Sequence, residues 1–233
     1  MNMNLRKTCR RTVFLAAALS LPLAAAAVPF SNGGFELPGV SPGTNASLSD
    51  GSNTPPTGWT VGGTTTPFAM FYENNTFGVI AFSGLNAVGF GGNGTTGATL
   101  SQTFDTVLGQ VITVNYFVTS QQGNDTGRQS LLLQALNGVA ILGSTTDVIP
   151  DTFAAFNWVA GPALTFVATG ASSTIRFTDT STQSNSSNWA LDGVSVSGIE
   201  APPVAGVPEP STYGLMVAGL GLLGFLARRR SKT

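Results

Sequence analysis

Histidine is absent from the 233-residue sequence, and the only cysteine, Cys9, lies within the first 27 residues. The stretch from Val28 to Val207 also contains no lysine. These absences exclude Ser-His-Asp triads, Cys-His pairs, histidine-ligated metals, disulfides, Schiff bases and P-loop phosphate binding in that stretch. Any chemistry there must come from carboxylates, amides, hydroxyls and aromatic rings.

Positive charge is scarce in the same stretch. Of the ten basic residues, four precede position 12 and four follow position 227, so only Arg128 and Arg176 remain between them. Residues 28–207 contain ten acidic residues and these two basic ones, which gives a net charge of about −8. An acidic surface with no basic patch excludes nucleic acid as a partner. It suits cations such as Ca²⁺ and neutral polysaccharides.

Residues 1–27 have the pattern of a secretory signal peptide. A basic start is followed by an apolar run over 13–23 and by three alanines at 25–27. We therefore predict export through the general secretory route and a mature chain that begins near Val28. The alternatives are a twin-arginine signal at Arg10-Arg11 and an uncleaved N-terminal anchor.

The C-terminal tail has three parts in a fixed order. Pro208, Glu209 and Pro210 precede an uncharged apolar run over 213–227, which is followed by the basic residues Arg228, Arg229 and Arg230. This tail resembles the PEP-CTERM sorting signal of Gram-negative bacteria. The resemblance implies that an exosortase, a membrane protease-transpeptidase, recognises Pro208, Glu209 and Pro210 and processes the chain nearby.

The apolar run predicts a transmembrane helix over 213–227. It has 15 residues, fewer than the roughly 20 that usually span a bilayer. Three arginines after the run would stay in the cytoplasm and leave the bulk of the chain outside. The alternatives are a single-span anchor that is never processed and an amphipathic helix buried in a globular domain.

Residues 28–198 predict one all-β domain, because short alternating runs recur between turn-rich loops and no stretch has helical periodicity. Asn137-Gly138 marks a hairpin. We expect residues 39–56 to form a long polar loop and 199–207 to form a stiff linker. The expected strands are Gly33–Leu37, Gly58–Val61, Pro67–Tyr72, Asn86–Phe90, Thr99–Phe104, Gln110–Thr119, Ser130–Leu136, Val139–Leu142, Trp158–Ala168, Ser173–Thr178 and Trp189–Ser197.

A series of short motifs resembles galactose-binding-like jelly rolls, a group that includes many bacterial carbohydrate-binding modules. The resemblance implies a jelly-roll β-sandwich. In order along the chain, the motifs are Asn32-Gly33-Gly34-Phe35-Glu36, Gly58-Trp59, Leu100-Ser101-Gln102-Thr103-Phe104, Trp158 and Leu191-Asp192-Gly193-Val194-Ser195-Val196.

In those jelly rolls an N-terminal Glu and an Asp of the last strand often hold a structural Ca²⁺, and the matching positions here are Glu36 and Asp192. Ca²⁺ takes 6–8 oxygen ligands, so backbone carbonyls and either Asn32 or Asp50 would have to contribute. The family usually has a second acidic or polar residue after the Asp, where this chain has Gly193. The alternative is that both acids are exposed at strand ends.

Aromatic residues are the candidates for stacking on sugar rings. Tyr72, beside Glu73, is the one we expect to be exposed, whereas Trp59 and Trp158 match core positions of the jelly rolls. Phe71 and Trp189 are further candidates. The loop with Gln121, Gln122, Asn124, Asp125 and Arg128 is either a ligand loop or simply a solvated one.

No pair of acidic residues is marked by local sequence as the two carboxylates of a glycosidase. Asp147 and Asp151 lie close together in the chain, and we interpret them as turn residues around Pro150. The sequence therefore predicts a non-catalytic envelope or extracellular-matrix protein that binds polysaccharide in an exopolysaccharide or biofilm context. The alternatives are a structural surface protein with no specific ligand and a glycan-degrading enzyme.

Overall fold

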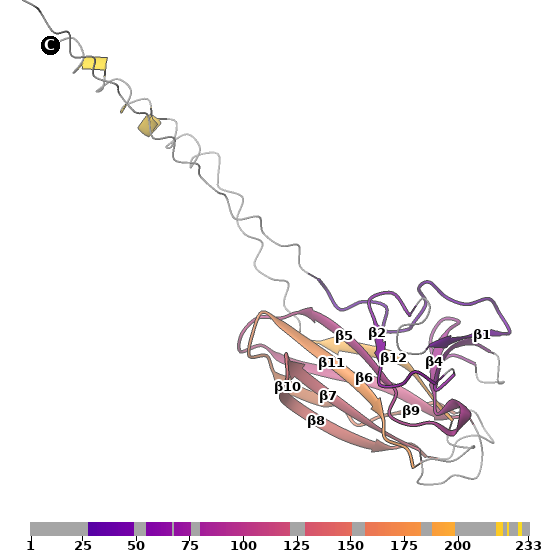
Figure 1. Ribbon diagram of the computed structural model, residues 1–233. Helices are drawn as coiled ribbons and strands as arrows, with labels where there is room; N and C mark the ends of the chain where they lie inside the picture. The colour runs from indigo at the N-terminus through magenta and orange to yellow at the C-terminus, as the bar shows by residue number, and fades with distance from the viewer. Residues whose placement is uncertain are drawn as a thin grey trace, which may run out of the picture.

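The computed structural model describes residues 28–48, 55–66, 68–75, 80–121, 129–150, 157–182 and 188–198, together with 218–220, 223, 228 and 229. Between 28 and 198 they form two sheets packed as a β-sandwich (Figure 1). Every strand pairing within them is antiparallel. The prediction of an all-β sandwich is confirmed. Residues 1–27, the linker 199–207 and Pro208, Glu209 and Pro210 lie outside the described residues.

The first sheet, sheet A, has seven strands and carries most of the predicted site residues. Its order is β1-β3-β4-β12-β6-β10, and β9 also pairs with β6. These strands are β1 (Thr44–Leu48), β3 (Met70–Asn74), β4 (Ala87–Phe90), β6 (Val111–Ser120), β9 (Val159–Ala160), β10 (Leu164–Val167) and β12 (Trp189–Ser197).

The second sheet, sheet B, has five strands in the order β2-β5-β11-β7-β8. They are β2 (Thr60–Gly62), β5 (Thr99–Asp105), β7 (Ser130–Asn137), β8 (Ala140–Val148) and β11 (Ser172–Asp179). β7 and β8 form the predicted hairpin, with Asn137 paired to Ala140 across a two-residue turn that contains Gly138 at φ 58°. A single 3₁₀ turn, η1 (Gly92–Gly94), precedes β5.

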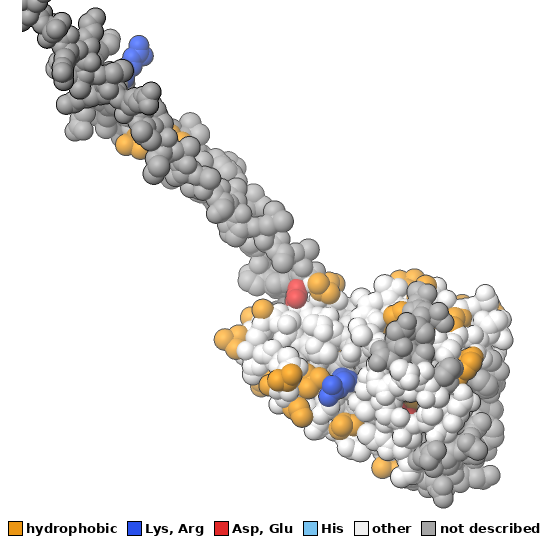
Figure 2. Space-filling model, viewed as in Figure 1, with side chains coloured by type: hydrophobic (Ala, Val, Ile, Leu, Met, Phe, Trp, Pro, Cys, Tyr) orange, Lys and Arg blue, Asp and Glu red, His pale blue; other side chains and the backbone are white. Residues whose placement is uncertain are grey.

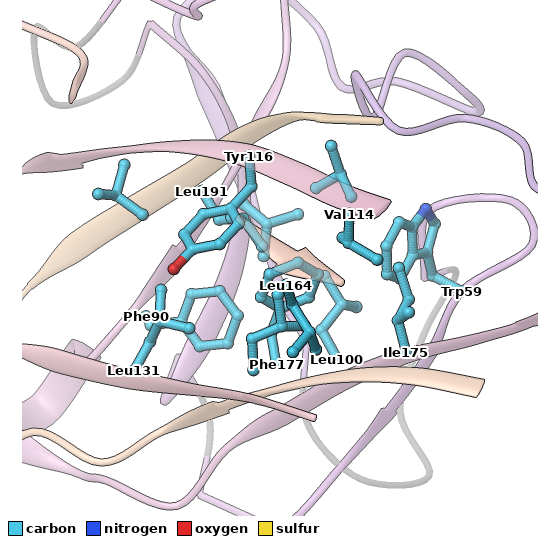
Figure 3. Packing of buried hydrophobic residues seen from close by; sticks show 14 of the residues in the cluster. Trp59, Phe90, Leu100, Val114, Tyr116, Leu131, Leu164, Ile175, Phe177 and Leu191 are labelled. Atoms are coloured by element: carbon cyan, nitrogen blue, oxygen red, sulfur yellow. The ribbon is translucent and has the colours of Figure 1, made fainter. Parts of the chain in front are cut away.

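The core lies between the two sheets and follows the predicted alternation of β6. Ile112, Val114, Tyr116 and Val118 are all buried there and face residues of sheet B. Figure 3 shows Tyr116, Val114, Leu164 and Leu191 packed over side chains that include Phe177, Ile175 and Leu131. Burying this much apolar surface is the main source of stability in a domain that holds no cysteine.

Alternation fails in β12, and a β-bulge is the reason. The register of β12 against β6 shifts between Asp192 and Ser195, where Gly193 has a φ of 60°. Since a bulge adds one residue to one strand, Leu191 and Val194 both belong to the core cluster. Asp192 therefore faces the outer side of sheet A. Strict alternation along Trp189–Ser197 would instead place Asp192 and Val194 on one side.

The first half of the domain differs most from the prediction. Strand β1 lies inside the segment 39–56 that we expected to be a loop, and Gly33–Leu37 is not a strand. β1 is rich in polar residues, but it pairs over its whole length with β3. Strand formation by such a segment depends on its neighbour in the sheet, which local propensity does not report.

Six residues of the C-terminal tail are described. Ala218, Gly219, Leu220, Leu223, Arg228 and Arg229 are helical and exposed, whereas Arg230 and most of 213–227 lie outside the described residues. Among the described residues, no helix has the length and apolar character needed to span a bilayer.

Candidate functional site

Asn32 closes a compact turn that places Glu36. Its side-chain oxygen accepts the backbone N–H of Leu37 at 3.0 Å, and its amide nitrogen donates to the carbonyls of Leu37 (2.8 Å) and Thr57 (3.1 Å). The backbone carbonyl of Asn32 accepts the indole N–H of Trp59 at 3.0 Å. Both polar atoms of this side chain are therefore used inside the turn, and a contribution of Asn32 to a calcium site stays a prediction.

Glu36 binds the loop 82–86, which joins β3 to β4. Its Oε1 accepts the backbone N–H groups of Leu85 and Asn86, each at 3.0 Å, and its Oε2 accepts the Asn86 side-chain amide at 3.1 Å. Gly84 has a φ of 67°, and a Cβ there would lie 2.3 Å from Oε1. The carboxylate thus fills the space that a side chain at position 84 would need.

Asp192 holds the same loop from the other side and is fully buried. Its Oδ2 accepts the backbone N–H of Ser83 at 2.9 Å, and its Oδ1 accepts that of Gly193 at 2.5 Å. Burial raises the pKa of Asp192 to about 7 against the lowering effect of these N–H groups, and the charge of Glu36 raises it further. We call Glu36, Asp192 and the loop 82–86 the acidic clasp.

The acidic clasp fits Ca²⁺ in charge and donor type. Two carboxylates within electrostatic range of each other supply hard oxygens, and both also accept N–H groups on their loop side. Asp50 lies outside the described residues, and within the described part of the chain no group of three or more acidic, His or Cys side chains could hold a metal. Backbone carbonyls or water would have to complete the 6–8 ligands, and the calcium site stays a prediction.

We expect Ca²⁺ to raise the melting temperature of the chelator-treated full-length chain at pH 8, where Asp192 is ionised. At a concentration about 100-fold above Kd, one site adds about 2.7 kcal/mol, or roughly 5–10 °C for a domain of this size. Differential scanning calorimetry measures the shift. Glu36→Gln should lose the part of the melting-temperature shift that comes from Ca²⁺ binding at the acidic clasp. An equal shift in wild type and variant would refute the prediction.

Beside the acidic clasp, three aromatic side chains gather on the outer face of sheet A. Phe82 stacks on Phe117, with ring centroids 3.6 Å apart and planes at 17°. Trp158 meets Phe82 edge-on at 6.3 Å. A Cβ on Gly193 would lie 2.7 Å from Phe82 and 3.1 Å from Phe117, so the residue after Asp192 must be glycine for this contact to form. We call Phe82, Phe117 and Trp158 the aromatic cluster.

The aromatic cluster is partly exposed. Phe82 has an exposed fraction of 42%, and Trp158 and Phe117 are half-buried. The Trp158 indole donates to the backbone carbonyl of Ile80 at 2.8 Å, which fixes its ring against the segment that leads to Phe82. Ile80, Leu85 and Val159 are exposed nearby in the chain. The expectation that Trp158 belongs to the core is therefore wrong, and this tryptophan lies at the surface.

Tyr72 is not a surface residue, contrary to our expectation. Its exposed fraction is 1%, and its hydroxyl donates to the carbonyl of Phe35 and accepts the N–H of Gly39. Burial is the main reason that the pKa of Tyr72 is raised to about 12. Its ring faces the core from β3 and offers no face to a sugar. Trp59, Phe71 and Trp189 are buried as well.

Sequence reasoning missed Phe82 and Phe117. Phe117 alternates with the core residues Tyr116 and Val118, so its outward direction was implied by the strand pattern. Phe82 lies in a loop, where its position depends on tertiary contacts with the acidic clasp, Phe117 and Trp158. In the predicted ligand loop, Gln121 is buried, and 122–128 lie outside the described residues.

Two further acids have structural partners. Asp147 lies in β8, not in a turn as we expected, and accepts the Tyr116 hydroxyl at 3.3 Å. Asp179 accepts the Ser181 hydroxyl (2.6 Å) and the Trp189 indole (3.2 Å). Burial raises the pKa of both carboxyls. Asp151 lies outside the described residues. Asp147, which is partly buried, and Asp179, which is buried, therefore accept hydrogen bonds from side chains of the other sheet.

Comparison with known proteins agrees with two predictions, the sorting signal in the C-terminal tail and the β-sandwich fold. The family model of the PEP-CTERM protein-sorting motif matches residues 206–230, so the chain carries this motif. The motif implies an exported protein that is processed by an exosortase and sorted to the cell envelope. No curated protein matches the sequence.

Among solved structures, a Stig cyclase (Fisc) from Fischerella sp. TAU, in complex with an indole compound, has a TM-score of 0.53 at 18% identity. The match covers 74% of this chain and 97% of that one. TmCBM61 in complex with beta-1,4-galactotriose has a TM-score of 0.48 at 16% identity, covering 73% and 98% of the two chains. At such identities the likeness to the cyclase shows a shared fold alone.

Proposed function

We propose that this chain is an exported, non-catalytic β-sandwich protein that binds neutral polysaccharide at the cell envelope or in the extracellular matrix. The observation that carries the proposal is the partly exposed aromatic cluster beside the acidic clasp. Apolar faces of sugar rings pack against aromatic rings, and exposed apolar patches on soluble domains often mark binding surfaces. The biofilm association of PEP-CTERM proteins supports the same context.

The acidic clasp supports this proposal because it positions the aromatic cluster. Glu36 and Asp192 hold the loop 82–86 through four hydrogen bonds, and Phe82 is the first residue of that loop. Such an arrangement pre-organises a surface and lowers the entropy lost on binding. Residues 28–207 hold ten acidic and two basic side chains, and a domain with so few charges suits neutral glycans. Figure 2 shows few charged side chains among the described residues of the one face in view. Carboxylates at 28–207 would repel acidic polysaccharides.

A glycosidase typically uses two carboxylates that face each other across a cleft. Glu36, Asp147, Asp179 and Asp192 all accept hydrogen bonds that hold loops or strands together. This use of the described acids favours a binding protein over a glycan-degrading enzyme. The tail, with Pro208, Glu209 and Pro210, would deliver the domain to its exosortase.

We expect Phe82→Ala to weaken polysaccharide binding about tenfold, equivalent to about 1.4 kcal/mol. The full-length chain in mild detergent would be tested for retention on a panel of insoluble neutral β-linked polysaccharides. Val139→Ala is the matched control, because Val139 is fully exposed in the β7–β8 turn of sheet B. Equal retention of both variants would refute the role of Phe82, and no retention of wild type would favour a structural protein without a ligand.

Tryptophan fluorescence provides an independent readout. The chain has three tryptophans, and Trp59 and Trp189 are buried whereas Trp158 is partly exposed. A soluble oligosaccharide bound at the aromatic cluster should therefore change the emission of Trp158. Trp158→Phe should abolish that change, and its persistence would place the ligand elsewhere.

A further inference from the structure

A second group of buried polar side chains lies on the outer face of sheet A, at the ends of three strands. Glu73 belongs to β3, Gln121 directly follows β6, and Asn188 directly precedes β12. The Gln121 side-chain amide donates to Oε1 of Glu73. The backbone N–H of Gln121 donates to the carbonyl of Asn188 at 2.9 Å, which continues the β6–β12 ladder by one pair.

Strand pairing places Gln121 beside Asn188, and a side-chain hydrogen bond joins Gln121 to Glu73. Residues directly opposite each other on antiparallel strands point to the same face, so the side chains of Gln121 and Asn188 share one face. Gln121 reaches Glu73 on that face. Gln129 also stabilises this group, because its side-chain amide donates to the backbone carbonyl of Asn188 at 2.8 Å.

Each of the three side chains has one buried oxygen without a hydrogen-bond partner. They are Oε2 of Glu73, Oε1 of Gln121 and Oδ1 of Asn188. Glu73 has an exposed fraction of 1% and Gln121 of 3%. Buried polar atoms are almost always satisfied in native proteins, and leaving one unpaired costs about 1–3 kcal/mol. Three unpaired oxygens on neighbouring side chains therefore point to a missing partner. Because all three atoms are acceptors, that partner must donate hydrogen bonds or carry positive charge.

Three kinds of partner are conceivable, and they satisfy the oxygens to different degrees. A proton on Glu73 supplies one donor, and a water molecule supplies two but leaves the buried charge uncompensated. Arg176 is the only basic residue described between 28 and 198, and its guanidinium donates to Gln134 in sheet B at 2.7 Å. A cation held between the three side chains would satisfy the three oxygens and would also neutralise the carboxylate.

We propose that Glu73, Gln121 and Asn188 bind a divalent cation of the size of Ca²⁺ on the outer face of sheet A, at a site separate from the acidic clasp. One carboxylate and two amide carbonyls are hard oxygen donors, which Ca²⁺ accepts in flexible geometry. Mg²⁺ demands near-ideal octahedral geometry and keeps several waters, so it suits buried amide oxygens less well. Water or backbone carbonyls would supply the remaining ligands. The cation would join β3 to β6 and β12 across the sheet.

Equilibrium dialysis of the chelator-treated full-length chain against Ca²⁺ at pH 8 tests the proposal. We expect Glu73→Gln to bind one Ca²⁺ fewer than wild type. Glu36→Gln is the matched control, because it alters the acidic clasp and should leave the Glu73 site occupied. Equal numbers of bound Ca²⁺ in wild type and Glu73→Gln, or no Ca²⁺ bound to wild type, would overturn the proposal.

A second variant protects the test if Glu73→Gln does not fold. Asn188→Ala removes one ligand from a half-buried position at the end of β12, and we expect its Ca²⁺ affinity at this site to fall at least tenfold. Calorimetric titration with Ca²⁺ in the Glu36→Gln background measures that site by itself. Unchanged affinity in Asn188→Ala would overturn the assignment of the ligands, whatever the outcome at the acidic clasp or with polysaccharide.

Discussion

Without a bound cation, the free energy of unfolding should fall as the pH rises from about 4.5 to about 8, and Glu73 should account for much of the fall. Burial raises the pKa of Glu73 from 4.5 to about 8 against the lowering effect of its hydrogen bond from Gln121. The folded protein therefore holds this proton more tightly than the unfolded chain does. Stability is highest below pH 4.5, decreases through this window and levels off above it.

The difference between a pKa of 4.5 and one of about 8 corresponds to a loss on the order of 4 kcal/mol. Glu73→Gln, which has nearly the same shape and no charge, should remove most of that loss. Urea unfolding in chelator at pH 4.5, 6, 7 and 8 measures it. The two proteins should be similar at pH 4.5 and differ most at pH 8.

Asp192 provides an internal comparison. Its pKa is raised to about 7, so its share of the decrease that remains in Glu73→Gln should end about one pH unit earlier. Added Ca²⁺ should flatten the wild-type profile, because the cation stabilises the ionised form of Glu73. A wild-type free energy of unfolding that stays constant from pH 4.5 to 8 in chelator would contradict the burial of a Glu73 carboxyl with one unpaired oxygen.

Trp189→Ala should destabilise the domain by about 3–5 kcal/mol, the usual cost of removing a large buried aromatic side chain. Trp189 is fully buried, stacks on Phe90 at 4.3 Å with planes at 6°, and donates its indole N–H to Asp179. The variant loses these contacts and also leaves the buried Asp179 with one donor fewer. Urea unfolding at pH 6 measures the change.

Trp158→Ala is the matched control, because it removes the same side chain from the partly exposed aromatic cluster. We expect it to cost about 1 kcal/mol or less, as substitutions at partly exposed positions usually do. Similar losses in the two variants would show that the two tryptophans are not placed as described. Trp189→Phe should recover part of the packing but not the hydrogen bond to Asp179.

Strand β3 illustrates why the candidate site was only partly predictable from sequence. All five of its residues, Met70–Asn74, are buried, so neither face stands out as polar or apolar. Alternation places Tyr72 and Glu73 on opposite faces but does not say which face is the core. We expected Tyr72 at the surface, but it faces the core. Glu73 points to the outer side of sheet A and is nevertheless buried there.

The β12 bulge is the second case. An alternating sequence such as 191–196 predicts two faces, but one extra residue at Gly193 reverses the assignment for every residue after it. The bulge brings Val194 into the core beside Leu191, and the glycine at 193 leaves room for Phe82 above Phe117. A bulge depends on the pairing of β12 with β6, and residues 75 or more positions apart in the chain decide it.

The sequence by itself determined the properties that depend on composition and local order. The absence of histidine, and of lysine between 28 and 207, excludes whole classes of chemistry, and the acidic balance argues against nucleic acid as a partner. The tail carries its sorting motif as a linear signal that needs no folded partner. Alternation in β6 and the Asn137-Gly138 turn also predicted their strands, because both effects act over a few residues.

Only the tertiary structure decided which side chains share a site. Glu36, the loop 82–86 and Asp192 meet although up to 156 positions separate them, and Glu73, Gln121 and Asn188 come together from three strands. Burial is a property of the whole packed sandwich, so it determined that Tyr72 and Trp189 belong to the core and Trp158 to the surface. The same burial left three oxygens of Glu73, Gln121 and Asn188 unpaired, and that observation has no counterpart in the sequence.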